Sequence, residues 1–124
     1  MSEHIQDLLN FLDASPTAVQ ASEQAVARLR VSGFRELDEA SAWKLRSGGK
    51  YFVRRQNTVL ALVTGSQPLT KTGFQLAAAH LDSPGLKLKP DSLKTEGGIS
   101  RVAVEVYGGP ILSTWTDREL GIAG

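Results

Sequence analysis

One short stretch of the sequence carries the residue types that metal chemistry needs. His80 and Asp82 stand two residues apart, directly after the small apolar run 77–79. In an extended chain side chains alternate between two faces, so these two side chains point to the same side. A histidine that binds a metal through one ring nitrogen usually donates its other ring N–H to a carboxylate, which fixes the direction of the ring. The spacing is therefore consistent with a metal ligand, His80, and a carboxylate that orients it, Asp82.

The same two residues also fit an ordinary surface pair at the end of a strand. No second histidine lies nearby, because the other histidine of the chain is His4. The chain has no cysteine, so a zinc ion here would be bound by histidine and carboxylates. From the residue pattern alone both interpretations stay open.

Composition restricts the class of protein. The 124 residues are 41% hydrophobic and 22% charged, as in a single soluble globular domain. The net charge of +1, from 14 basic and 13 acidic residues, argues against a nucleic-acid surface. We find no signal-peptide pattern, and no run approaches the roughly 20 apolar residues of a membrane span. We therefore expect no nucleic-acid or membrane partner, and the lack of cysteine is compatible with a reducing cytoplasm.

Two helices are predicted at the N-terminus. Apolar residues at helical spacing predict an amphipathic helix within residues 2–14, with Ser2 as its N-cap. A second helix could begin with Ser15 as its cap, or with Thr17 as its cap and Gln20 completing a capping box; we favour Thr17. Gly33 is expected to end this helix. Its expected buried stripe is Ala18, Ala25, Val26 and Leu29.

The middle of the chain reads as strands. We expect a short strand at 34–37, a turn or a single helical turn at 38–45, and a hairpin whose strands, 51–55 and 58–64, join at Gln56-Asn57. Residues 59–63 are apolar on both faces, which predicts an inner strand of a covered sheet.

Residues 74–79 form another apolar run and predict a further buried strand that ends at His80. In open α/β sheets ligands bind beyond the carboxyl ends of strands, which suits a functional histidine at this place.

The remaining residues predict two more strands. Residues 86–89 alternate between apolar and charged side chains, which predicts a half-buried strand with Lys87 and Lys89 turned outward. Residues 91–98 are predicted to be a polar connection, and residues 99–106 a second strand. Asp117 and Arg118 are expected to form a structural ion pair. Together these elements predict an α/β fold in which two N-terminal helices pack on a mixed β-sheet.

Five blocks of the sequence resemble one enzyme family. They stand in order along nearly the whole chain and are 11–17 (FLDASPT), 49–51 (GKY), 79–90 (AHLDSPGLKLKP), 104–109 (VEVYGG) and 114–120 (TWTDREL). In this order and spacing they are similar to the aspartyl aminopeptidases, a family of zinc metallopeptidases. The resemblance implies a zinc-exopeptidase-like catalytic domain.

The resemblance also implies an activity and a site. Members are cytoplasmic exopeptidases that remove N-terminal Asp or Glu from peptides with two zinc ions, and they assemble into large homo-oligomers, typically dodecamers. The histidine at the position of His80 is a metal ligand and the aspartate at the position of Asp82 orients it. The paired ions lower the pKa of a bridging water and polarise the scissile carbonyl, while a carboxylate takes the proton.

The other ligands of the family have no counterpart in this sequence. They are a bridging aspartate, an adjacent pair of glutamates, a further acidic ligand and a second histidine, and they follow the region matched here. We therefore expect residues 1–124 to be the N-terminal portion of the catalytic domain, with the rest of that domain and the oligomer-building domain absent. The isolated chain is expected to be inactive. The alternative is a noncatalytic module that self-associates, for example as a dimer, or binds an intact subunit.

Overall fold

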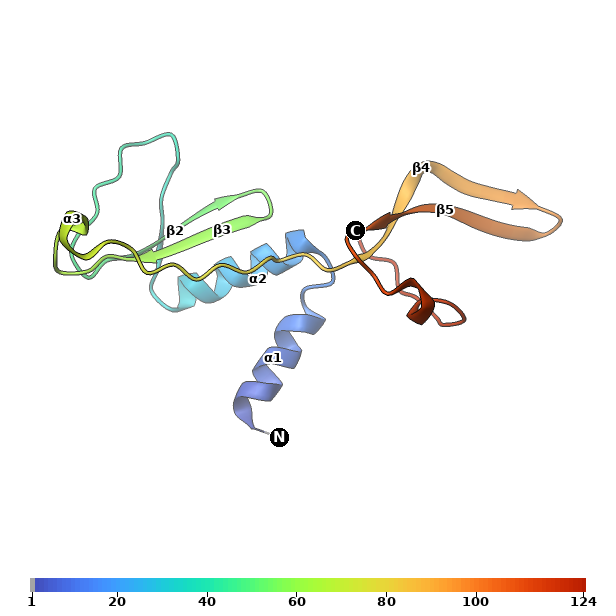
Figure 1. Cartoon of the computed structure of the whole chain (residues 1–124), viewed down its shortest axis with the longest axis horizontal. Helices are drawn as coiled ribbons and strands as arrows, with labels where there is room; N and C mark the ends of the chain where they lie inside the picture. The colour runs from blue at the N-terminus through green and yellow to red at the C-terminus, as the bar shows by residue number, and fades with distance from the viewer. Residues whose placement is uncertain (1) are drawn as a thin grey trace. The chain divides into compact units, whose positions relative to one another are not determined.

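A computed structural model describes residues 2–124. The chain forms two compact units, which divide between Asp82 and Ser83 (Figure 1). We describe each unit by itself.

Two helices open the first unit, α1 (Glu3–Asp13) and α2 (Ala18–Val31). Thr17 is the N-cap of α2: its side-chain oxygen accepts a hydrogen bond from the Gln20 backbone N–H at 3.4 Å and its hydroxyl donates to Gln20 Oε1 at 2.9 Å. The capping oxygen satisfies one of the N–H groups that have no partner within the helix. The predicted start at Thr17, rather than at Ser15, is confirmed.

Gly33 ends α2 as predicted. Its φ of +82° lies in the left-handed region that favours glycine. The N–H of Gly33 bonds the carbonyl of Arg30, and the N–H of Phe34 bonds the carbonyl of Leu29, both at 3.0 Å. This pair of bonds is a Schellman motif, which satisfies carbonyls at the end of the helix.

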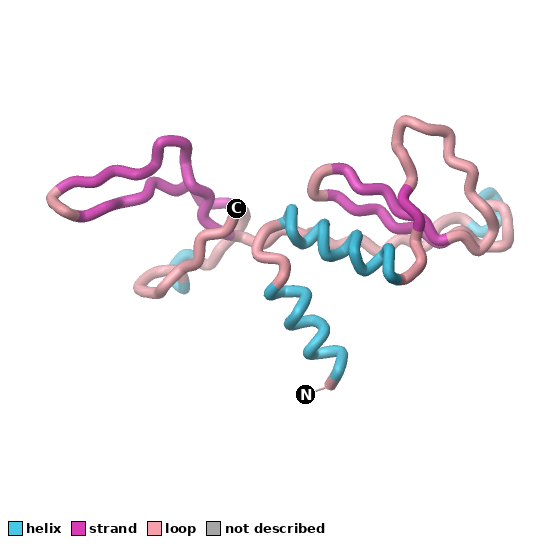
Figure 2. The backbone as a smooth tube through the Cα atoms, turned by 180° about the vertical axis from the view of Figure 1, so that it is seen from behind, coloured by secondary structure: helices cyan, strands magenta, loops and turns pink. Residues whose placement is uncertain are grey.

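A mixed sheet packs against α2. It has the order β1 (Arg35–Glu36), β2 (Lys50–Arg55), β3 (Thr58–Val63), with β1 parallel and β3 antiparallel to β2. Figures 1 and 2 show the hairpin of β2 and β3 beside α2. The hairpin turn contains Gln56, at φ +52°, where the sequence placed it. Helix α2 contacts β2 and β3, and α1 contacts α2. The predicted α/β architecture with a mixed sheet is confirmed.

The core of this unit lies between α2 and β2. The buried residues described are Ala21, Ser22, Val26, Tyr51, Phe52 and Val53. Of the predicted helical stripe only Val26 is fully buried, while Ala18, Ala25 and Leu29 are half-buried. The sequence missed Ser22, whose hydroxyl donates to the carbonyl of Val19 at 2.7 Å. A hydroxyl that is hydrogen-bonded in this way can be buried on a helix face. The polarity of Ser22 therefore did not exclude it from the core, although the predicted buried stripe omitted it.

Two predictions about strands in this unit are wrong. The apolar strand β3 lies at an edge of the sheet, not inside it, and Val63 is 62% exposed. Residues 74–79 form no strand: after the short helix α3 (Leu69–Thr72) the chain runs without regular structure, drawn as loop in Figure 2, with Phe74 83% and Leu76 82% exposed. Within residues 2–124 neither segment has a further strand beside it, and a strand requires a hydrogen-bonded neighbour.

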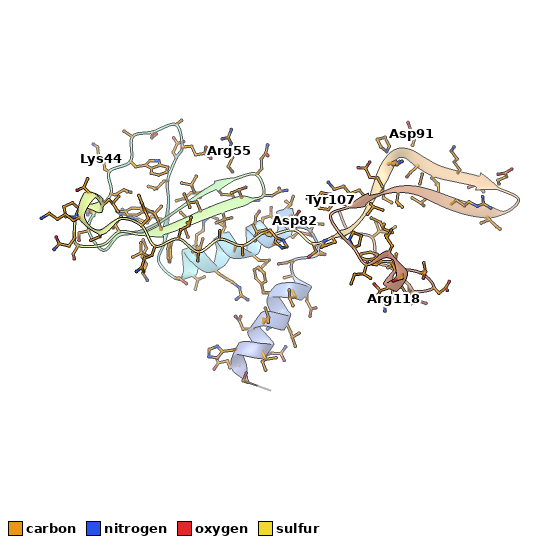
Figure 3. The ribbon with its side chains drawn as sticks, viewed as in Figure 1. Lys44, Arg55, Asp82, Asp91, Tyr107 and Arg118 are labelled. Atoms are coloured by element: carbon orange, nitrogen blue, oxygen red, sulfur yellow. The ribbon has the colours of Figure 1, made fainter. Side chains whose placement is uncertain are left out.

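The second unit is built on one antiparallel hairpin, β4 (Gly85–Glu96) and β5 (Ile99–Tyr107). The predicted polar connection at 91–98 is wrong, because β4 continues to Glu96. An irregularity in the pairing between Leu88 and Leu93 accommodates the polar residues, and Asp91, labelled in Figure 3, has φ +50° there. Such irregularities carry extra residues on one strand without ending it.

A single 3₁₀ turn, η1 (Leu112–Thr114), follows the hairpin. Among the ion pairs of the described residues none joins Asp117 to Arg118, so the structural pair expected there is not formed.

Candidate metal site at His80

His80 and Asp82 contact each other at the end of the irregular segment. Nδ1 of His80 lies 2.7 Å from the backbone carbonyl oxygen of Asp82 and 3.3 Å from its carboxylate Oδ1. The His80 side chain is 80% exposed and that of Asp82 is 41% exposed. Figure 3 labels Asp82 on this segment. The two residues that the sequence paired are therefore brought together, although not by a strand.

The backbone contact selects a tautomer of the ring. A carbonyl oxygen can only accept, so Nδ1 of His80 must carry the proton and donate it to Asp82. In the neutral ring the lone pair then lies on Nε2. A metal-binding histidine has this arrangement, with one nitrogen held by an oxygen acceptor and the other left for the ion.

The carbonyl of Asp82 is the part of the site that the sequence did not reveal. Every residue has a carbonyl, so only the local path of the chain makes this one an acceptor for His80. It is closer to Nδ1 than the carboxylate that the spacing pointed to. Asp82 thus presents two oxygens to the ring, of which the backbone oxygen is the nearer.

His80 fits one ligand position of a zinc site, and the described residues do not complete the site. Zinc takes three or four protein ligands from histidine, carboxylate or thiolate. Across residues 2–124 there is no cluster of three or more such side chains. One imidazole with its partner cannot hold an ion in a defined geometry, so no catalytic step can be derived from this chain alone.

The second unit fixes the turn that follows the candidate site. In the hairpin register Gly85 lies opposite Tyr107, and the ammonium of Lys87 lies 3.8 Å from the centre of the Tyr107 ring. Gly108, at φ +71°, comes so close to Pro84 that an added Cβ would lie 3.3 Å from its Cα. Parts of two of the blocks named above, 79–90 and 104–109, are thus held against each other within this unit.

The first unit also carries a surface depression. This depression, of about 460 Å³, lies between α1 and α2 and is mostly apolar. On its wall Arg28 forms a bidentate pair with the Asp7 carboxylate, at 2.6 and 2.9 Å. None of the helices described is long and apolar enough to cross a membrane.

Comparison with known proteins identifies the family. The sequence pattern of the aminopeptidase I zinc metalloproteases (M18) matches residues 11–124. A probable M18 family aminopeptidase 2 from Streptomyces coelicolor is 45% identical over 98% of this chain and 28% of its own length. A probable aspartyl aminopeptidase from Ricinus communis is 44% identical over 95% of this chain and 24% of its own length.

Solved structures agree with this result. A chain in the cryo-EM structure of the Ape4 and Nbr1 complex matches 91% of this chain with a TM-score of 0.83 and 40% identity, over 22% of its own length. The aminopeptidase I of Borrelia burgdorferi matches 94% of this chain, and 30% of its own, with a TM-score of 0.75. At 23% identity the second match shows the fold alone. This chain spans between a fifth and a third of each of these relatives, and it belongs to the M18 family of zinc aminopeptidases.

Proposed function

We propose that residues 1–124 are the N-terminal portion of the catalytic domain of an M18 aminopeptidase that removes acidic residues from peptide N-termini. The observation that carries the proposal is the His80–Asp82 contact, which holds Nδ1 and presents Nε2 on an exposed ring. Membership of a zinc metalloprotease family makes zinc the ion that this nitrogen would bind.

His80 is proposed as a ligand and Asp82 as the residue that positions it. A two-zinc centre, when bound, would supply an activated water and polarise the scissile carbonyl. Within this chain, the Asp82 carbonyl holds the proton on Nδ1, so that in the neutral ring the lone pair lies on Nε2. Replacing such an orienting partner typically lowers metal affinity or activity by about 10- to 100-fold.

We propose that the remaining ligands belong to the part of an M18 aminopeptidase that the region matched here does not include. We therefore propose that the isolated chain is catalytically inactive, and that activity, homo-oligomeric assembly and a cytoplasmic location belong to the complete protein. The preference for acidic residues rests on the relative from Ricinus communis, which is a probable aspartyl aminopeptidase. No basic side chain of this chain is assigned to that preference.

A chimera tests the function. The segment of the Streptomyces coelicolor relative that matches this chain would be replaced by residues 1–124, and hydrolysis of aspartyl and alanyl p-nitroanilides would be measured. We expect zinc-dependent hydrolysis with the aspartyl substrate preferred. His80→Ala should abolish it and lower the zinc content, whereas His4→Ala should change neither. A chimera that folds and assembles but keeps its activity with His80→Ala would refute the assignment.

A metal titration of the isolated chain tests the incompleteness of the site. We expect no stoichiometric zinc after dialysis, with or without His80→Ala. Tight zinc binding that depends on His80 would show that the ligand set is complete within these residues.

A noncatalytic role is the second candidate, and one observation favours it. The chain leaves large apolar side chains exposed on several elements, among them Leu12 of α1 at 55%, Val63 of β3 at 62% and Leu93 of β4 at 67%. Exposed apolar side chains that lie together on a surface mark sites of association. A module that binds another chain, whether a second copy or an intact subunit, would use them.

A further inference from the structure

A pocket lies on the face of the β2–β3 hairpin that points away from α2. In β2 the side chain of Arg54 reaches Glu23 of α2 at 3.4 Å, so Arg54 marks the face toward the helix. Because side chains alternate along a strand, Val53 and Arg55 point to the opposite face. The residues paired with them in β3 share that face. The pocket on it has a volume of about 340 Å³ and is lined by Glu39, Trp43, Val53, Arg55, Thr58 and Leu60.

One wall of this pocket is a loop that is held by its own hydrogen bonds. The Asp38 carboxylate accepts from the Ala40 N–H at 2.9 Å and from the Ser41 hydroxyl at 2.8 Å. The indole N–H of Trp43 donates to the Asp38 carbonyl at 2.8 Å. These contacts hold Trp43, and Glu39 next to Asp38, before any ligand binds. A wall that is already formed lowers the cost of binding.

The pocket is apolar inside and carries two opposite charges at its rim. Val53 is only 8% exposed, and Leu60 and Trp43, 47% and 41% exposed, add apolar surface. At the rim Nη1 of Arg55, labelled in Figure 3 at the end of β2, lies 3.8 Å from Oε2 of Glu39. Small-molecule sites usually have this form, an apolar pocket in which a few polar groups fix the orientation of the ligand.

The two charges at the rim can still form hydrogen bonds with a ligand. Their separation of 3.8 Å exceeds hydrogen-bond length, and within residues 2–124 neither side chain has a hydrogen bond to another group. An exposed pair of this kind contributes little to stability, so a ligand that separates its partners loses little. Arg28, in the depression between α1 and α2, differs because both of its terminal nitrogens already donate to Asp7, at 2.6, 2.9 and 3.1 Å.

We propose that this pocket binds a free α-amino acid with an apolar side chain. The ammonium and the carboxylate of such a molecule sit on one carbon, so that two adjacent opposite charges meet the two at the rim. Arg55 takes the carboxylate through paired N–H donors, Glu39 takes the ammonium, and the apolar side chain lies against Trp43. A longer peptide carries these charges at opposite ends and offers the rim only one of them. The inference goes beyond the proposed function and does not depend on it.

A titration of the chain with L-leucine, followed by ¹H–¹⁵N spectra, tests the proposal. The indole N–H of Trp43 reports occupancy, and Trp43→Phe distinguishes its signal from that of Trp115. We expect a saturable shift with a Kd of about 1 mM, because the ligand is small. N-acetyl-L-leucine lacks the ammonium and L-leucinamide lacks the carboxylate, so each should bind about 10-fold more weakly. L-Aspartate should also bind more weakly, because its side chain is charged.

Matched variants assign the two charges. Arg55→Gln should weaken the binding of L-leucine about 10-fold and remove the preference for L-leucine over L-leucinamide. Glu39→Gln should remove the preference over N-acetyl-L-leucine in the same way. Arg54→Gln is the control, because Arg54 is next in sequence but lies on the α2 face, and it should bind like the unchanged chain. The side chains of Arg55 and Glu39 are 80% and 44% exposed, so their replacement should leave the fold intact, which the spectra of the free variants check.

Three results would overturn the proposal. The first is no shift of the Trp43 indole at about 20 mM L-leucine, where a Kd of about 1 mM gives nearly full occupancy. The second is equal binding of L-leucine by Arg55→Gln and Arg54→Gln. The third is equal affinity of the unchanged chain for L-leucine and N-acetyl-L-leucine, which would show that the ammonium is not recognised.

Discussion

Replacement of Asp82 by asparagine distinguishes the contributions of the two oxygens that face the His80 ring. The substitution removes the carboxylate charge 3.3 Å from Nδ1 and leaves the backbone carbonyl at 2.7 Å in place. If the carbonyl is the principal acceptor, His80 should keep the proton on Nδ1. If the carboxylate is the principal acceptor, the tautomer should change.

The two contributions can be compared from their geometry. A typical hydrogen bond contributes about 0.5–1.5 kcal/mol net, which corresponds to an approximately 2- to 13-fold bias toward the Nδ1–H tautomer. The neutral ring carries no charge, so the exposed carboxylate contributes at most what a pair of exposed charged groups does, about 0.2–1 kcal/mol, or about 1.4- to 5-fold. With side chains 80% and 41% exposed, the carboxylate contribution belongs at the lower end. We therefore expect Asp82→Asn to shift the tautomer ratio by less than about 3-fold.

Long-range ¹H–¹⁵N correlation spectra measure this ratio directly. They would be recorded at a pH where the ring is neutral, on the unchanged chain, on Asp82→Asn and on a short blocked histidine peptide as reference. Zinc affinity of the chimera should fall by about 10-fold with Asp82→Asn, the lower end of the range for a positioning residue. A variant ratio equal to that of the peptide would show that the carboxylate alone orients the ring. An unchanged chain that already matches the peptide would show that the contact does not persist in solution.

Three further predictions concern the first unit. Gly33→Ala should lower the free energy of unfolding by about 1–2 kcal/mol in urea, because φ +82° is unfavourable for a residue with a Cβ; no loss would mean that the Schellman turn is not formed. Tyr51→Phe should cost about 1–3 kcal/mol in the same assay, since the Arg46 N–H donates to the buried tyrosine oxygen at 2.9 Å and would lose its acceptor; a neutral result would indicate that water replaces it. The N–H of Ala40 and the hydroxyl of Ser41 bond the Asp38 carboxylate and lower its pKa below 3.8. This carboxylate therefore stabilises the 38–41 turn above that pH and ceases to do so as the pH falls through its lowered pKa. The Ala40 amide shift should titrate with a midpoint below 3.8, and a higher midpoint would contradict the contact.

The elements predicted correctly are those whose causes lie within a few residues. Thr17 caps α2 because the next turn of the helix offers its N–H groups, and Gly33 ends α2 because it alone accepts the local φ without strain. The turn at Gln56 joins two strands that are neighbours in sequence. His80 and Asp82 meet because they are two residues apart.

Two of the wrong predictions concern which part of the polypeptide packs against an apolar segment. Residues 59–63 and 74–79 are apolar, and apolarity predicts that a segment is buried without naming its neighbour. In the described residues β3 lies at a sheet edge and Phe74 is exposed, because a strand and its burial both depend on polypeptide that is distant in sequence. The wrong prediction at 91–98 has a different cause. β4 continues beyond the bulge because its later residues pair with β5, and the polar residues of this segment did not indicate that pairing.

The sequence by itself therefore determined the family, both helices with their ends, the β2–β3 hairpin and the pair His80–Asp82. Only the tertiary structure decided that β2 rather than β3 is the inner strand, that Ser22 belongs to the core, and that the Asp82 carbonyl is the nearest acceptor for the ring. The physical reason is the separation along the sequence over which each interaction acts. Caps, turns and side-chain types act between near neighbours, whereas strand order, burial and the direction of a backbone carbonyl depend on the path of the folded chain.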